Sequence, residues 1–296
     1  MTSYRATLCG LLAIVLWSMS LGLMRSITSA LGPAAGAAFI FTSAFLFVLV
    51  LQGKSAWSTY SRPYLLLCGS LFVAYEICLI GAIGMAHTHL QSIELGMINY
   101  LWPCLTILLA IPIHKQKTNG AVWLGMLLAL GGIILIMSGN GSWSPQALWT
   151  NITGNPIPYT MALAAAIIWA LYNNLVKKYG RGNRSVAPFL LVTALLLWIN
   201  LLFQPYQPIV WSTRIIMELI FLGISTATAY TVWNIGIKQG NLMTLTFASY
   251  FTPALSAIIA CMWLKTLPTP FFWFGLILLI CGALLCWLAT RKLSRT

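Results

Sequence analysis

The stretch Asn99-Tyr100-Leu101-Trp102-Pro103 places a proline inside a long apolar run, and it recurs 150 residues downstream as Ser249-Tyr250-Phe251-Thr252-Pro253. Four further identical pairs keep the same spacing: Lys115 and Lys265, Trp123 and Trp273, Gly125 and Gly275, and Gly132 and Gly282. Identities that stay in register over this length indicate an internal repeat.

In each copy the proline falls inside a segment too apolar for a loop, so we expect it to interrupt a helix. Proline lacks an N–H and pushes away the carbonyl four residues back, which here frees the carbonyls of Asn99 and Ser249. Inside a bilayer such a carbonyl is tolerated only where protein, water or a ligand satisfies it. Interrupted helices at matching places in two halves are typical of a transporter's central site. Pro103 and Pro253 are therefore the predicted hinges.

The chain is too apolar for a soluble protein. Of its 296 residues, 60% are hydrophobic and 6% are charged, against roughly 25% charged in soluble domains. Ten apolar runs are long enough for a bilayer core of about 30 Å, at residues 8–28, 34–52, 64–85, 90–113, 120–139, 158–176, 186–205, 215–237, 243–264 and 270–290. We therefore expect an all-α membrane protein with ten transmembrane helices, surrounded by the lipid bilayer.

Each half of the chain holds five of these spans, so the second half must enter the membrane from the opposite face. Trp17 and Trp169 extend the repeat to the first span of each half. The prediction is two inverted five-helix repeats, residues 1–140 and 158–296, around a central cavity. Residues 141–157 carry no charge and are rich in Gly, Asn, Ser and Pro, so they are predicted to form an external loop that links the repeats.

The basic residues indicate orientation and not a nucleic-acid partner. The formal charge is +13, but Lys and Arg are distributed among the segments between spans instead of gathered on one face. With the N-terminus inside, all 16 of them except Arg25, Arg214 and Lys265 fall on the cytoplasmic side. Cytoplasmic segments of membrane proteins carry this excess, so both termini are predicted to be cytoplasmic.

The acidic residues exclude several function classes. The chain has no Asp, and its only acids are Glu76, Glu94 and Glu218. Walker-type ATPases and aspartate-based intramembrane enzymes are thereby excluded. His87 and His89 lack a third ligand, so no metal site is predicted, and nothing indicates a cofactor. No nucleophile and base stand at a usable spacing, so an enzyme is not expected.

Glu76 lies near the middle of the third span, where an ionised side chain costs at least roughly 2.5–3.5 kcal/mol. Two interpretations stay open. Glu76 is either a proton carrier or partner for a substrate ammonium group, or a protonated carboxyl that hydrogen-bonds to a neighbouring helix. Glu94 is predicted to be structural or part of a gate. Glu218 follows Arg214 by four residues and is predicted to form an ordinary ion pair.

Aromatic side chains with polar atoms occur near the centres of several spans, with small polar residues three or four positions away. Residues at this spacing share one helix face, so we expect them to converge on the cavity. Such a wall suits a ligand with an aromatic or apolar body and a zwitterionic end. The competing interpretation, that Trp and Tyr mark the membrane interfaces, fits poorly for Trp17, Trp169 and Tyr230. The candidate substrate-binding residues are Trp17, Tyr75, Glu76, Asn99, Tyr100, Trp102, Trp169, Tyr172, Asn173, Tyr230, Trp233, Asn234, Ser249 and Tyr250.

Several stretches together resemble aromatic amino acid exporters of the drug/metabolite transporter (EamA-type) superfamily, namely residues 5–18, 75–79, 91–103, 116–119, 249–253 and 285–291. The resemblance extends over nearly the whole chain. It implies ten helices in two inverted repeats, a bacterial inner-membrane location, and export of phenylalanine, tyrosine and tryptophan. Similar proteins are also reported to accept other neutral amino acids and some toxic cations. The resemblance places cavity residues at Tyr75, Tyr100, Trp102, Trp169 and Ser249.

The main hypothesis is a secondary carrier that binds an amino acid near the membrane midplane and alternates its access by rocking helices of the two halves. The alternative within the transporter class is an exporter of lipophilic cations or toxic metabolites such as viologens, with Glu76 as counter-charge. The alternative outside it is a non-transporting scaffold or an intramembrane enzyme. The sequence leaves open whether export is driven by protons or runs down the amino acid gradient.

Overall fold

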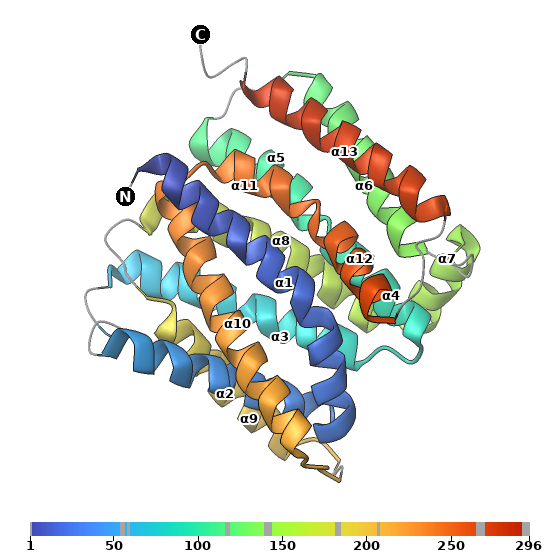
Figure 1. Cartoon of the computed structure of the whole chain (residues 1–296). Coiled ribbons are helices and arrows are strands. Elements are labelled where there is room, and N and C mark those ends of the chain that lie inside the picture. The colour runs from blue at the N-terminus through green and yellow to red at the C-terminus, as the bar shows by residue number, and fades with distance from the viewer. Residues whose placement is uncertain are drawn as a thin grey trace. The chain divides into compact units, whose positions relative to one another are not determined.

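The computed structural model describes residues 2–53, 57, 60–115, 119–138, 144–180, 185–205, 208–264 and 270–291, and no strand occurs in these ranges (Figure 1). A π-helical turn, η2 (Tyr64–Cys68), leads into α3. The α-helices are α1 (Ser3–Leu31), α2 (Pro33–Gln52), α3 (Gly69–Gly84), α4 (His89–Asn99), α5 (Trp102–His114), α6 (Ala121–Ser138), α7 (Pro145–Gly154), α8 (Pro156–Tyr179), α9 (Ala187–Leu202), α10 (Thr213–Gln239), α11 (Leu242–Ser249), α12 (Thr252–Leu264) and α13 (Pro270–Arg291).

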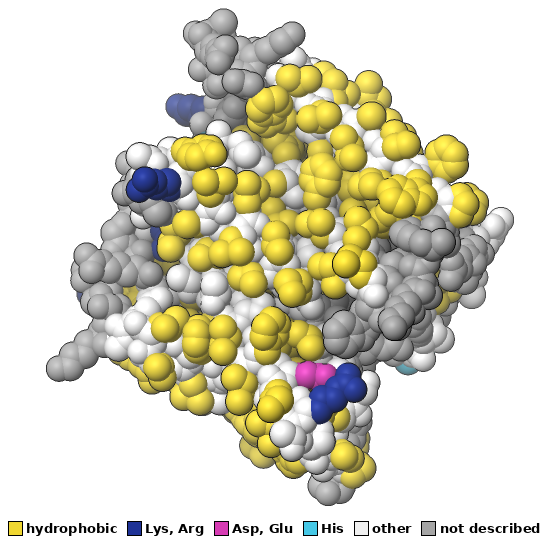
Figure 2. Space-filling model, viewed as in Figure 1, with side chains coloured by type: hydrophobic (Ala, Val, Ile, Leu, Met, Phe, Trp, Pro, Cys, Tyr) yellow, Lys and Arg dark blue, Asp and Glu magenta, His cyan; other side chains and the backbone are white. Residues whose placement is uncertain are grey.

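Within the described ranges, seven helical segments are long and apolar enough to cross a membrane. Two shorter apolar helices, Ala121–Ile136 and Ala187–Leu202, coincide with two further predicted spans, and α11 with α12 covers the predicted span 243–264. Many large apolar side chains are exposed, and hydrophobic side chains are spread over much of the face shown in Figure 2. Such a surface needs lipid around it. The chain is an all-helical, multi-pass membrane protein, while the number of ten crossings and the inverted repeats stay predictions.

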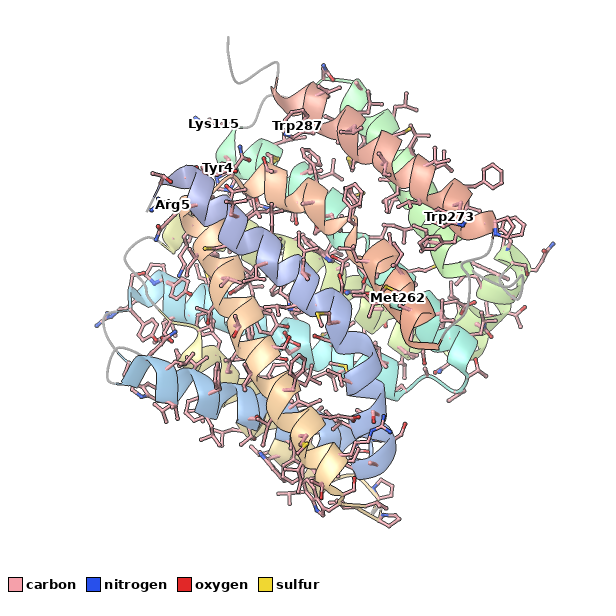
Figure 3. The ribbon with its side chains drawn as sticks, in the orientation of Figure 1. Tyr4, Arg5, Lys115, Met262, Trp273 and Trp287 are labelled. Atoms are coloured by element: carbon pink, nitrogen blue, oxygen red, sulfur yellow. The ribbon has the colours of Figure 1, made fainter. Side chains whose placement is uncertain are left out.

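Charged and aromatic side chains stand at several helix ends (Figure 3). Tyr4 and Arg5 lie in the first turn of α1, Lys115 directly follows α5, and Trp273 lies in the first turn of α13. Tyr, Trp, Lys and Arg favour the boundary between lipid and water. These residues therefore suit the places where their helices leave the hydrocarbon core.

The external loop predicted for residues 141–157 is wrong in part, because Pro145–Gly154 form the helix α7. The Ser144 hydroxyl accepts a hydrogen bond from the Ala147 backbone N–H at 3.1 Å and so caps the first turn. Pro145 stands in that turn, where its missing N–H costs nothing. Ser144 and Pro145, whose residue types indicated a loop, begin a helix instead.

The described chain divides into two compact units, each of which takes segments from both predicted repeats. The first comprises Met1–Ile80 and Leu175–Gly240. In it α1 packs along α10, and α2 packs against α9 and α10. Gly223 permits the approach of α10 to α2, because a Cβ at this position would lie 2.1 Å from the Ser43 hydroxyl oxygen.

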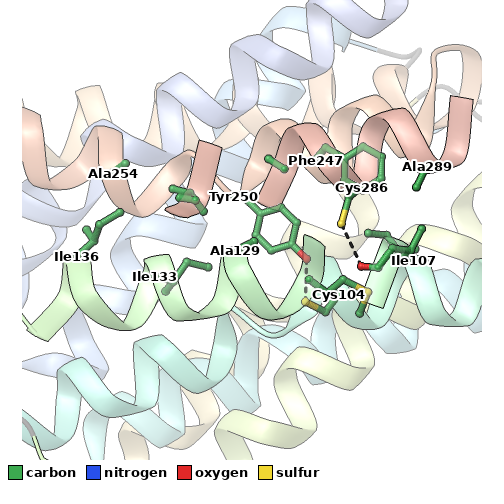
Figure 4. Packing of buried hydrophobic residues seen from close by; sticks show 14 of the residues in the cluster. Cys104, Ile107, Ala129, Ile133, Ile136, Phe247, Tyr250, Ala254, Cys286 and Ala289 are labelled. Carbon is green, nitrogen blue, oxygen red and sulfur yellow. Dashed lines mark hydrogen bonds between the residues drawn. The ribbon is translucent and has the colours of Figure 1, made fainter. Parts of the chain in front are cut away.

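The second unit comprises Gly81–Asn174 and Asn241–Thr296. In it α6 packs along α13, α11 lies against α13 and α5, and α12 lies against α6. Its core draws on all these helices and includes Ile107, Ile133, Phe247 and Cys286 (Figure 4). The two interrupted helices therefore belong to one packed unit.

Glycines bring α6 and α13 into backbone contact. A Cβ built on Gly125 would lie 2.8 Å from the Gly282 carbonyl oxygen, and one on Gly132 would lie 2.6 Å from the Gly275 carbonyl oxygen. Small residues allow membrane helices to approach this closely. In the sequence repeat, Gly125 is equivalent to Gly275 and Gly132 is equivalent to Gly282. The contact of Gly125 with Gly282 is therefore equivalent to the contact of Gly275 with Gly132.

Candidate functional site

The repeated proline segment forms an interrupted helix in both copies. The first helix ends at Asn99 in one copy and at Ser249 in the other, and the next begins three residues later, at Trp102 and Thr252. In the turns between them, the Leu101 N–H donates to Ile98 and the Phe251 N–H donates to Ala248, each at 3.0 Å and three residues back. The two breaks thus match in position and in this hydrogen bond, whereas the Tyr100 N–H donates to Gly96 and the Tyr250 N–H donates to Phe247.

The first break presents acceptor groups that the helix does not satisfy. Pro103 has no N–H to donate to the Asn99 carbonyl. The side-chain Oδ1 of Asn99 is buried, with no hydrogen-bond partner among the residues that the structure describes. Buried acceptors of this kind require a donor, and a substrate ammonium group or a water molecule can supply one.

An aromatic cluster lies next to this break in the second unit. The rings of Trp169 and Tyr172 are stacked, with centroids 4.8 Å apart and planes at 17°. Trp102, at the start of α5, meets Trp169 edge-on at 6.4 Å. All three side chains are buried. The structure thus brings together three of the candidate residues, from α5 and α8.

A second aromatic cluster lies in the first unit and contains Glu76. The carboxylate of Glu76 accepts a hydrogen bond from the Tyr230 hydroxyl. Trp17 meets Tyr230 with centroids 5.6 Å apart and Trp233 with centroids 5.1 Å apart. These four candidates come from α1, α3 and α10, and Glu76 is 4% exposed.

Some polar candidates are engaged within their own helices. The Ser249 hydroxyl donates to the Thr246 carbonyl at 2.6 Å, and the Asn234 amide donates to the Tyr230 carbonyl at 2.9 Å. Tyr75 and Asn173 are buried, while Tyr100 packs at the edge of the core of the second unit. Their role as ligands for a substrate stays a prediction.

The structure also shows contacts that the sequence did not indicate. The Cys104 thiol and the Tyr250 hydroxyl lie 2.7 Å apart and link the two interrupted helices (Figure 4). Asn174 donates to the Thr106 carbonyl at 3.0 Å. Phe72 meets Tyr230 at 4.8 Å. In the sequence, Cys104 resembles an ordinary apolar packing residue. Phe72 precedes Glu76 by four residues, and this spacing could have placed it on the same helix face as Glu76.

The other two acids contact polar side chains outside the two aromatic clusters. Glu94 is buried on α4 and accepts hydrogen bonds from the Tyr159 hydroxyl and, at 3.2 and 3.0 Å, from the Asn151 amide. Because Asn151 belongs to α7, this carboxylate holds the linker helix to α4. The predicted pair of Arg214 and Glu218 is confirmed, with a nitrogen–oxygen distance of 2.7 Å.

Comparison with known proteins identifies the family of the chain. Residues 156–288 match the model of the EamA-like transporter family. The chain is 40% identical to the aromatic amino acid exporter YddG of Salmonella typhimurium over 99% of its length and 100% of the relative. It is 41% identical to YddG of Escherichia coli, with the same coverage, and 30% identical to YddG of Ancylobacter novellus over 88% of both chains.

A solved crystal structure has the same fold. It covers 99% of both chains with a TM-score of 0.80 and 26% sequence identity. The family assignment rests on the 40% identity with YddG exporters over 99% of the chain. The chain therefore belongs to the EamA-like transporter family.

Proposed function

We propose that this chain is a secondary transporter that exports phenylalanine, tyrosine and tryptophan, with wider amino acid specificity, across the bacterial inner membrane by alternating access. The observation that carries this proposal is the 40% identity with YddG exporters over almost the entire chain. The cluster of Trp102, Trp169 and Tyr172 supports it, because stacked and edge-on rings favour an aromatic ligand. The buried Oδ1 of Asn99, which has no hydrogen-bond partner among the described residues, supplies a place for the ammonium group.

The test of this function is counterflow of labelled tryptophan in proteoliposomes that contain the full chain. Preloaded unlabelled tryptophan should drive transient accumulation of the label, and phenylalanine and tyrosine should compete with it. A viologen that competes better than these amino acids would favour the cation-export alternative. Vesicles that show no counterflow for any amino acid would contradict the transport function itself.

The proposal includes an inverted five-helix repeat. The exchange of partners between the Gly125–Gly282 and Gly132–Gly275 contacts supports it, since a two-fold axis makes residue i contact j wherever j contacts i. The excess of Lys and Arg on one side supports cytoplasmic termini. Tags at the two ends should both be shielded from impermeant reagents in intact cells, and labelling of either tag would contradict this topology.

The proline breaks are proposed as the bending points of the transport cycle. Replacing Pro103 with alanine restores an N–H that can donate to the Asn99 carbonyl and so join the two helices across the break. The stiffened helix should lower the initial rate of counterflow about tenfold. Pro112 is the matched control, because it is exposed within α5 and its repeat equivalent is Met262. Pro112→Met should change the rate less than about twofold, and equal losses in both variants would refute the hinge role.

A further inference from the structure

Two buried ionisable side chains lie along the interface between α3 and α10 in the first unit. Glu76 is 4% exposed and Lys238 is 6% exposed. Glu76 lies well inside the apolar segment Tyr64–Gly84, and Lys238 lies near the end of Thr213–Gln239. A charge at the centre of a bilayer costs roughly 2.5–3.5 kcal/mol on insertion scales. Two ionisable groups on one interface therefore suggest a role beyond packing.

The contacts along this interface follow one antiparallel register. Glu76 and Phe72 both meet Tyr230, whereas the Lys238 Nζ lies 5.4 Å from the centroid of the Tyr64 ring. Later residues of α10 thus contact earlier residues of the η2–α3 segment, so the two segments run antiparallel. The polar members stand four or eight residues apart on each helix, which keeps them on one face. We call this set the polar seam: Tyr64, Cys68, Glu76, Tyr230, Asn234 and Lys238.

The residues of the polar seam are spaced from the middle of a span to a helix end. The distance along α10 from Tyr230 to Lys238 is about 12 Å at 1.5 Å per residue. Asn234 lies between them and donates to the Tyr230 carbonyl at 2.9 Å. Cys68 is buried and follows Tyr64 by four residues. The Tyr64 hydroxyl is buried without a hydrogen-bond partner in the described part of the chain, a position that suits a bridging water.

Aromatic side chains pack against Tyr64 and Tyr230 of the polar seam. Phe189 of α9 packs on Tyr64 at 5.2 Å and on Phe72 at 5.8 Å. Gly69 admits this ring, because a Cβ there would lie 2.8 Å from it. Neither α2 nor α9 contains an ionisable residue. The remaining ionisable residues of the surrounding helical segments are Tyr75 and Cys78 on α3, Arg214 and Glu218 on α10, Tyr4, Arg5, Cys9 and Arg25 on α1, and Lys177, Lys178 and Tyr179 on α8.

We propose that the polar seam conducts protons between Glu76 and the helix end at Lys238, and that Glu76 takes up and releases a proton in each transport cycle. This inference rests on the proposed transport function. Protonation converts the Glu76 carboxylate into a neutral carboxyl group, and release of the proton along the seam restores the carboxylate. Tyr230 is a positioning residue, because its hydroxyl fixes the carboxylate by donating to it. Export by this chain is then coupled to the proton gradient.

The experiment uses proteoliposomes with the full chain, labelled tryptophan and a trapped pH indicator. Exchange at equal pH is measured first, followed by net flux under an imposed pH gradient. Tryptophan should move protons with the wild-type chain, and Glu76→Gln should reduce protons moved per tryptophan to the leak level. Lys238→Met should lower the ratio of gradient-driven flux to exchange about tenfold, since a positioned proton-transfer group contributes at least that much.

Glu218→Gln is the matched control, because this acid pairs with Arg214 outside the polar seam. It should keep the wild-type number of protons per tryptophan. The inference is overturned if net tryptophan flux through the wild-type chain moves no protons, or if Glu76→Gln moves as many protons per tryptophan as the wild type. If Glu76→Gln does not assemble, an unchanged flux ratio in Lys238→Met overturns it. Absence of all exchange by the wild-type chain would instead refute the proposed function.

Discussion

Replacing Trp169 with alanine should lower counterflow of labelled tryptophan about tenfold relative to counterflow of labelled alanine. The expected change corresponds to about 1.4 kcal/mol, within the range of an aromatic pair and the burial that accompanies it. Trp169 stacks on Tyr172 and meets Trp102 beside the first helix break. A substrate ring that packs here loses its partner in the variant, whereas a methyl side chain has little to lose.

The ratio of the two substrates separates recognition from folding. Removal of a buried tryptophan destabilises the protein by roughly 3–5 kcal/mol, but fewer folded molecules lower both rates equally. Trp198→Ala is the control, because Trp198 packs on Phe39 and donates to Thr42 within the first unit. It should leave the ratio unchanged. If the Trp169→Ala variant loses counterflow of labelled tryptophan and of labelled alanine to the same extent, Trp169 does not stack on the substrate ring.

The sequence predicted helix positions well, because bilayer-crossing segments must be continuously apolar. Each of the ten apolar runs lies largely in described helices, and the breaks lie beside Pro103 and Pro253, as expected from the missing N–H. The structure of the linker, residues 141–157, was harder to predict. The tripeptide Ser144-Pro145-Gln146 is compatible with a turn or a capped helix start, and the contact of α7 with α4 decides between them.

The sequence predicted which residues lie in the aromatic clusters more reliably than it predicted the contacts that these residues make. Central position in a span identified Trp17, Trp169 and Tyr230, which all lie in aromatic clusters. Sequence spacing cannot show that Tyr230 donates to Glu76, since this contact joins helices 154 positions apart in the chain. Cys104 shows the same limit, because a thiol in an apolar run has no pattern that indicates its contact with Tyr250.

The same limit explains why the glycines were recognised as a repeat but not as an interface. A spacing of seven residues between Gly125 and Gly132 is compatible with one helix face, and it does not identify the facing helix. The structure supplies that helix, α13, and shows that the glycines of α13 meet those of α6. Adjacent glycines at positions 131 and 132 then differ in surroundings, which makes a direct test available.

Gly132→Ala should destabilise the protein by about 1–3 kcal/mol, the usual cost of an extra methyl group in a packed interface, whereas Gly131→Ala should not. A Cβ at Gly132 would lie 2.6 Å from both the Gly275 carbonyl oxygen and the Leu279 backbone nitrogen. Because both are backbone atoms, α6 and α13 must separate. At Gly131 nothing lies within 4 Å of the new Cβ, so alanine gains about 0.5–1 kcal/mol from its helix preference.

Thermal unfolding of purified protein in detergent measures this difference, with the two variants expected to shift the midpoint in opposite directions. Gly282→Ala extends the test to the repeat, because Gly282 is the equivalent of Gly132 and its new Cβ would lie 2.4 Å from the Ala129 backbone nitrogen. It should lower the midpoint as Gly132→Ala does. A Gly132→Ala protein as stable as Gly131→Ala would show that α6 and α13 do not meet through these glycines, and the exchange of partners that supports the inverted repeat would be lost with them.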